Sequence, residues 1–184
     1  MKICGSVFTF LFVIATVLCA KETQTEEAKP RSKKKPPPDI SVRVIQKGIY
    51  SLPDTTTAPA NDVPGGLRRV GKGGSPELLQ STNRVPANPH VEFGFVFRLQ
   101  GEPKGVEVPI QVVYLYPSGG LKPPDSKQPI YRSTYTHAYS IGDFHYVGYT
   151  LEKEWELVPG KWTVQMWFAN RLIVRQSFHL YSER

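Results

Sequence analysis

Apolar and polar residues alternate along the C-terminal part of the chain. The apolar positions are Trp162, Val164, Met166 and Phe168, followed by Leu172, Val174, Phe178 and Leu180. A period of two residues is typical of a strand with one buried face. Between the two segments, Ala169–Arg171 is short enough for an antiparallel reversal, in which Asn170 is expected to take a positive φ. The pattern predicts a closing β-hairpin.

The same periodicity recurs upstream, and no segment shows a helical period. Further strands are predicted at residues 40–50, 91–99, 108–116, 130–140 and 146–151, with one short strand near 77–81. Seven or eight short strands separated by turn residues are typical of a two-sheet sandwich. We therefore predict an all-β, immunoglobulin-like antiparallel β-sandwich over residues 40–181. Residues 51–89 are rich in proline and glycine and are predicted to form a long loop.

The N-terminus has the organisation of a secretory signal peptide. Lys2 precedes an apolar run from Val7 to Leu18, and a polar stretch begins after Ala20. The apolar run is shorter than the roughly 20 residues of a membrane span, although an uncleaved anchor helix is the alternative. Lipidation of Cys19 is a second alternative, but Leu18 is not the small residue that usually precedes a lipidated cysteine. We expect cleavage near Ala20 and an exported, periplasmic or secreted product.

A basic, proline-rich segment follows the predicted leader. The formal net charge of the chain is +7, and five of its cations lie within residues 29–35, next to the prolines of residues 36–38. Such a composition favours a disordered, extended tether over residues 21–39. Weak contact with an anionic membrane surface is a further interpretation of the charge, whereas nucleic acid is not an expected partner after export.

Several short motifs resemble a family of bacterial exported domains, the domain of unknown function 3859 family. The similar motifs are Gly48–Tyr50, Thr82–Pro86, Glu92–Phe95, Gly101–Gly105, Gly148–Tyr149, Trp155–Trp162 and Gln176–Phe178. The Trp155–Trp162 stretch, WELVPGKW, is the most specific of them. The resemblance covers about residues 42–180 and implies a bacterial envelope location. It implies no catalytic residue, because the role of the family is uncharacterised.

The sequence contains no recognisable catalytic or metal-binding motif. Both cysteines, Cys4 and Cys19, lie in the predicted leader, so the mature domain is expected to contain no disulfide. The four histidines, His90, His137, His145 and His179, lack the spacing of metal ligands. Glu152, Glu154 and Glu156 share one parity and are predicted to lie on a solvated strand face. We therefore predict a non-catalytic domain that needs no cofactor or metal.

Aromatic residues supply the one candidate binding surface. Tyr131, Tyr135 and Tyr139 share one parity, and Trp167 lies opposite the predicted core positions of its strand. If these four side chains formed an exposed face, they could stack against sugar rings or a partner protein. Burial in the core is the competing interpretation. The leading functional hypothesis is a module that binds another envelope protein, through surface contact or an exposed sheet edge; the alternative is a carbohydrate-binding module.

Overall fold

The computed structural model describes residues 39–52, 55–59, 67–71 and 75–182, which are all-β apart from one 3₁₀ turn. The strands are β1 (Ile40–Ser51), β2 (Thr55–Pro59), β3 (Leu67–Gly71), β4 (Glu77–Gln80), β5 (Arg84–Pro86), β6 (Glu92–Gly101), β7 (Glu107–Leu115), β8 (Arg132–Ser140), β9 (Phe144–Thr150), β10 (Gly160–Phe168) and β11 (Arg171–Tyr181). The 3₁₀ turn is η1 (Glu154–Glu156). The predicted signal peptide and tether, up to residue 38, lie outside the described residues.

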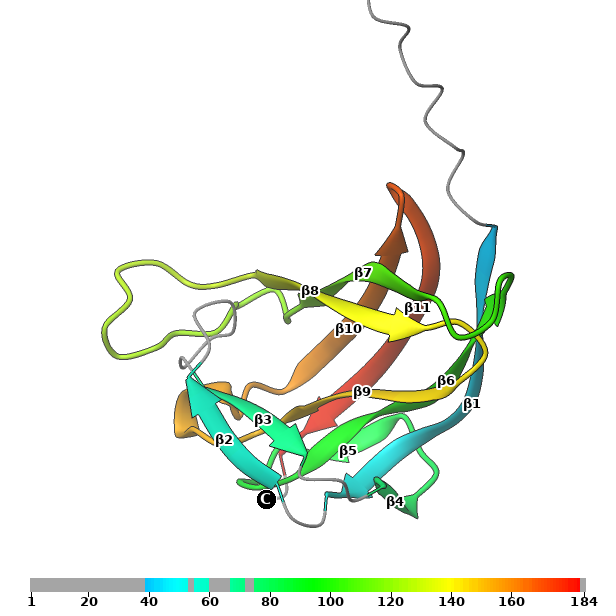
Figure 1. Cartoon of the computed structure of the whole chain (residues 1–184). Coiled ribbons are helices and arrows are strands. Elements are labelled where there is room, and N and C mark those ends of the chain that lie inside the picture. The colour runs from blue at the N-terminus through cyan, green and yellow to red at the C-terminus, as the bar shows by residue number, and fades with distance from the viewer. Residues whose placement is uncertain (1–38, 53–54, 60–66, 72–74, 183–184) are drawn as a thin grey trace, which may run out of the picture. The chain divides into compact units, whose positions relative to one another are not determined.

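Two sheets form a sandwich, as the alternation predicted (Figure 1). One sheet has four strands in the order β4-β1-β6-β9, and the other has five in the order β5-β11-β10-β7-β8. All neighbouring strands are antiparallel except β5, which runs parallel to β11. The strands β2 and β3 pair with each other in a separate two-stranded ribbon.

The core lies between the two sheets and is rich in aromatic side chains. From β6, Phe93, Phe95 and Phe97 point inward and are fully buried. The opposing β10 contributes Trp162, whose exposed fraction is 1%. Its ring packs edge-on against Phe93 at a centroid distance of 5.8 Å. Its indole nitrogen donates a 3.0 Å hydrogen bond to the Val158 carbonyl, so the polar end of this core tryptophan is satisfied.

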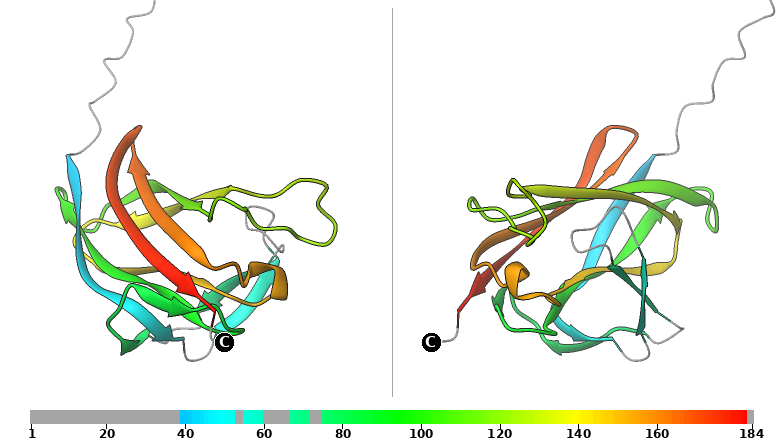
Figure 2. Two further views of the ribbon diagram at one scale, coloured as in Figure 1. Left: turned by 180° about the vertical axis from the view of Figure 1, so that it is seen from behind. Right: turned by 90° about the vertical axis from the view of Figure 1, so that its left-hand side faces the viewer.

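The closing hairpin forms where it was predicted. Phe168 pairs with Arg171, which leaves Ala169 and Asn170 as a two-residue turn. Both have positive φ, at 46° and 63° respectively, as a type I′ turn requires. The prediction for Asn170 is confirmed, whereas the positive φ of Ala169 was not anticipated. The tip of the hairpin projects beyond the neighbouring strands in both views of Figure 2.

The predicted long loop over residues 51–89 contains four short strands, β2 to β5. Only the strand near residues 77–81, now β4, was anticipated. The strand β5 has three residues and includes Pro86, so it has no readable period of its own. It is held by parallel pairing with β11, and Val85 is fully buried there. Such pairing between distant segments leaves no local signal in the sequence.

The two open sides of the sandwich differ. On one side β1 and β11 are bridged by Arg171, which donates to the Ile40 carbonyl at 2.7 Å and to the Asp39 carboxylate at 3.0 Å. On the other side lie the edge strands β8 and β9, joined by the short turn at residues 141–143 (Figure 1). There the Tyr114 hydroxyl donates to the Gly148 carbonyl at 2.7 Å, which links the two sheets.

Candidate functional site

The structure does not bring the four predicted aromatic residues together on one surface. Tyr135 and Tyr139 lie opposite Val112 and Val108 of β7, on the inner face of the five-stranded sheet. Tyr139 is buried, with an exposed fraction of 5%. Trp167 lies opposite Gln111 on the outer face of the same sheet. The aromatic platform expected for sugar binding is therefore not formed by these residues.

The four side chains do not share a face because Trp167 and the tyrosines lie on strands that are not neighbours. Strand β7 lies between β8 and β10, so the face of each strand depends on a register that sequence alone does not supply. Tyr131 precedes β8 and is 55% exposed, apart from the other two tyrosines. The shared direction of Tyr135 and Tyr139 was predicted correctly, but that direction is toward the core.

Glu156 occupies an environment that the sequence did not reveal. It was predicted to lie on a solvated strand face with Glu152 and Glu154, but it belongs to η1 and is only 4% exposed. Its carboxylate accepts the Tyr149 hydroxyl at 2.7 Å and the backbone N–H groups of Glu152 and Lys153, both at 2.8 Å. The conspicuous WELVPGKW motif thus closes the connection between β9 and β10 around a buried acceptor.

We predict that Glu156→Leu lowers the free energy of unfolding by about 2–4 kcal/mol, because the buried Tyr149 hydroxyl and two partly buried backbone N–H groups lose their acceptor. Glu156→Gln, which retains an acceptor oxygen, should cost no more than about 1 kcal/mol. Glu154→Leu is the matched control, because Glu154 lies in the same turn and is exposed. Urea unfolding followed by tryptophan fluorescence measures all three; equal losses for Glu156→Leu and Glu154→Leu would contradict the buried role.

The pH dependence of stability tests the same site. Burial raises the pKa of the Glu156 carboxyl above its usual 4.5, against the lowering effect of its hydrogen bonds to Tyr149 and the backbone. The folded state therefore retains this proton more readily than the unfolded state. The corresponding stabilisation is complete below pH 4.5 and is lost as the pH rises through the folded pKa. Relative to Glu156→Gln, the wild type should lose stability as the pH rises above 4.5; a difference that stays constant with pH would contradict this.

A second buried carboxylate, Glu92, lies on the outer face of the four-stranded sheet. It accepts the Tyr146 hydroxyl at 2.7 Å and the hydroxyl of Thr150. Glu156, by contrast, bonds to Tyr149 on the opposite, inner face of β9. The two carboxylates thus belong to separate hydrogen-bond networks on opposite faces of one strand. This is not the facing pair that general acid and base catalysis requires.

Three glycines support the Glu92 network. Gly48, Gly94 and Gly148 lie side by side on β1, β6 and β9 and form a row across the sheet. A Cβ at Gly148 would lie 2.0 Å from the Tyr146 hydroxyl oxygen, which shows how closely that side chain covers the row. The glycines therefore leave the space in which Tyr146 lies over the sheet and reaches Glu92.

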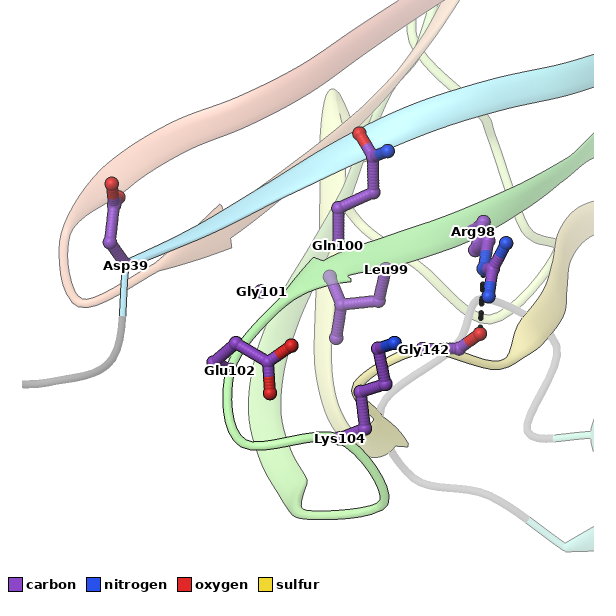
Figure 3. A pocket seen from close by; sticks show the side chains of 8 residues that line it. All are labelled: Asp39, Arg98, Leu99, Gln100, Gly101, Glu102, Lys104 and Gly142. Atoms are coloured by element: carbon purple, nitrogen blue, oxygen red, sulfur yellow. Dashed lines mark hydrogen bonds between the residues drawn. The ribbon is translucent and has the colours of Figure 1, made fainter.

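A shallow hollow of about 590 Å³ lies at the end of β6 (Figure 3). Its charged side chains are Asp39, Glu102, Arg98 and Lys104, all of them exposed. The Arg98 guanidinium already donates to the Gly142 carbonyl at 2.7 Å, as the dashed line in Figure 3 shows. Since two acids and two bases share the rim, the hollow has no preference for an anion or a cation. We assign it no function.

Within the described residues, no group of three or more histidine, cysteine or acidic side chains is arranged to hold a metal ion. No helix in the same part of the chain is long and apolar enough to span a membrane.

The exposed edge of β8 is the most distinctive surface feature. One side of β8 pairs with β7 along all nine residues of β8, and the opposite side is the exposed edge. Toward β7, the Tyr131 carbonyl accepts from Tyr116, and the Ile141 N–H donates to Val106. Hydrogen-bonded pairs alternate along an antiparallel ladder, so every second residue between 131 and 141 points its backbone groups at β7. The residues in between, Arg132, Thr134, Thr136 and Ala138, point theirs outward.

No strand among the described residues pairs with this outward side of β8. Arg132, Thr136 and Ala138 on this strand are exposed residues. The strand contains no proline and no lysine or acidic residue, which are the usual devices that prevent another strand from pairing with an edge. Arg132, at the first position, is its only formally charged residue.

The other edge strands are better protected. Strand β5 has three residues, of which one is Arg84 and one is Pro86. Strand β4 has four residues and begins with Glu77. In β9, the Gly148 carbonyl is already occupied by the Tyr114 hydroxyl. Among the four edge strands of the two sheets, β8 is the longest. The stretches of β1 (40–48) and β11 (171–178) without a second partner are of similar length, but they carry Arg43 and Lys47, and Arg171 and Arg175, whereas β8 carries only Arg132.

The fold and its open edge define the class: an immunoglobulin-like β-sandwich with a long, accessible edge strand. The family model described as "Domain of unknown function (DUF3859)" matches residues 39–180, and the chain belongs to this family. No curated protein matches the chain. Among solved structures, it is similar to the crystal structure of an immunoglobulin-like protein from Pseudomonas aeruginosa. The identity is 19%, the match covers 77% of this chain and 97% of that one, and the TM-score is 0.48.

Proposed function

We propose that this protein is an exported, non-catalytic interaction module that binds an extended segment of another cell-envelope protein by adding it as a strand to β8. The observation that carries the proposal is the row of outward backbone groups at Arg132, Thr134, Thr136 and Ala138. Main-chain hydrogen bonds to such an edge provide affinity, and alternate side chains of the guest provide specificity.

The side chains beside the edge indicate the chemistry of the guest. On the outer face, Thr134, Thr136 and Ala138 are small or β-branched and leave room for a close neighbour. On the inner face, Tyr135 is half-buried and His137 is exposed, with the His137 ring 4.7 Å from that of Tyr139. An aromatic or aliphatic side chain of the guest would extend this cluster. We therefore expect a proline-free segment with an alternating, β-prone sequence.

Export is part of the proposal and rests on the N-terminal sequence. The apolar run from Val7 to Leu18 between Lys2 and Ala20 supports a cleaved leader. The basic residues that follow, at positions 29–35, would favour contact with an anionic membrane surface. The partner would then be a neighbouring envelope protein.

Ala138→Pro is expected to abolish partner binding while leaving the fold intact. The substitution removes an outward N–H and puts the proline ring in the path of the guest strand, but it removes no bond to β7. The matched control is Ala138→Ser, which retains the N–H. In-cell crosslinking followed by mass spectrometry should recover one dominant envelope protein with the wild type and Ala138→Ser, but not with Ala138→Pro. Recovery of the same protein with all three, or of free monomer alone, would overturn the proposal.

A further inference from the structure

A second hollow, of about 300 Å³, lies on the outer face of the five-stranded sheet. Its side chains come from Pro109, Gln111, Thr136, Trp167 and the hairpin turn Ala169–Asn170. Trp167, Gln111 and Thr136 are direct cross-strand neighbours on β10, β7 and β8, so they form one row across the sheet. The volume is at the lower end of the range for small-molecule sites, which suits a single ring-sized group.

The indole of Trp167 is a fixed wall of this hollow. Its ring nitrogen donates a 3.0 Å hydrogen bond to the side-chain oxygen of Gln165, which is itself only 6% exposed. The buried amide therefore holds the ring in one orientation, and the ring remains partly accessible. The register between β10 and β11 shifts beside Trp167, where β11 carries one extra residue, Ile173, whereas the register between β10 and β7 stays regular and keeps Trp167 opposite Gln111.

The remaining lining groups are polar and uncharged. Gln111 and Asn170 carry amides, each with donors and an acceptor, and the Thr136 hydroxyl both donates and accepts. All three are exposed. Sugar hydroxyls also donate and accept, and the C–H face of a sugar ring packs well on an aromatic ring. Because no ionised side chain lines the hollow, it favours a neutral ligand over a uronic acid or an amino sugar cation.

We propose that this hollow, the Trp167 hollow, binds one ring of a neutral glycan, which stacks on the indole while Gln111, Asn170 and Thr136 bond to its hydroxyl groups. The site differs from the face first expected, since only Trp167 is common to both. The hollow and the β8 edge share Thr136, but the glycan requires the Thr136 hydroxyl, whereas strand addition requires the Thr136 backbone N–H and C=O groups.

Tryptophan fluorescence of the full chain tests the proposal directly. The probes are cellobiose, maltose and N,N′-diacetylchitobiose, with glucuronic acid as the charged comparison. At least one neutral disaccharide should change the emission with a Kd of about 1 mM, and glucuronic acid should bind more weakly. Trp167→Ala, assayed by saturation-transfer NMR because the reporter is lost, should weaken binding at least tenfold.

A matched threonine pair separates the hollow from the edge. Thr136→Ala removes a hydroxyl that lines the hollow and should weaken glycan binding several-fold. Thr134→Ala removes the corresponding hydroxyl two residues away on the same outer face and should leave glycan binding unchanged. Absence of binding by every neutral probe, or equal binding by the wild type and Trp167→Ala, would overturn the glycan proposal without bearing on strand addition.

Discussion

Replacement of Trp162 by alanine should lower the free energy of unfolding by about 3–5 kcal/mol, as is usual for loss of a large buried aromatic side chain. The ring lies between the two sheets, with centroids 4.9 Å from that of Tyr116 and 5.1 Å from that of Tyr149. Its removal would leave a cavity bounded by these rings, one of which, Tyr149, is held in β9, while Tyr116 follows directly after β7. Domains of this size have about 5–15 kcal/mol of stability in total, so the variant should be marginal at 37 °C.

Trp155→Ala is the appropriate control for the Trp162 prediction. Trp155 belongs to the same motif but is only half-buried, at the margin of the core. We expect a loss of about 1–2 kcal/mol, since less apolar area returns to water. Chemical unfolding followed by circular dichroism compares the two variants without depending on the substituted tryptophan. A loss below about 1 kcal/mol for Trp162→Ala would contradict its central place in the core.

Gly94→Ala should lower the free energy of unfolding by about 3 kcal/mol or more. Its Cβ would lie 2.3 Å from the Val147 carbonyl oxygen and 2.5 Å from the Gly148 Cα. Both are backbone atoms of β9, so relief requires that β6 and β9 separate. Gly148→Ala should cost less, because its Cβ would meet mainly side-chain atoms of Tyr146 and Glu92, which can rotate away.

Gly119→Ala provides the neutral comparison for these glycines. A Cβ there would meet nothing within 4 Å, and its φ does not lie in the left-handed region. Its free energy of unfolding should stay within about 0.5 kcal/mol of the wild type. Equal losses for Gly94→Ala and Gly119→Ala would contradict the close approach of β6 and β9.

In the double variant Gly148→Ala with Tyr146→Ala, the loss of unfolding free energy should be smaller than the sum of the losses of the two single variants.

Much of the fold could be predicted from the sequence because most strands have one buried face. The alternation at Phe93, Phe95 and Phe97 predicted β6 and the direction of its side chains correctly. The closing hairpin was equally clear, since Asn170 supplies a residue that tolerates positive φ. These signals are local: period, turn chemistry and strand length lie within a few residues of each other.

The features that depend on contacts between distant segments could not be predicted. Glu156 has the parity of a solvated strand residue, and only the folded loop shows that its carboxylate accepts two backbone N–H groups and the Tyr149 hydroxyl. The separation of Trp167 from Tyr135 depends on β7 lying between their strands. Sequence alone identified the aromatic and acidic residues as noteworthy, but which side chains share a surface is a property of strand order and register.

Amide hydrogen exchange along β8, measured by NMR, tests the strand-addition proposal most directly. In the isolated protein, the amides of Ser133, Tyr135, His137 and Tyr139 should exchange slowly because they bond to β7, whereas those of Thr134, Thr136 and Ala138 should exchange quickly. Addition of the peptide segment recovered by crosslinking should slow the second set at least tenfold and leave the first set unchanged. Continued fast exchange at Thr134, Thr136 and Ala138 with the peptide bound would contradict strand addition at this edge.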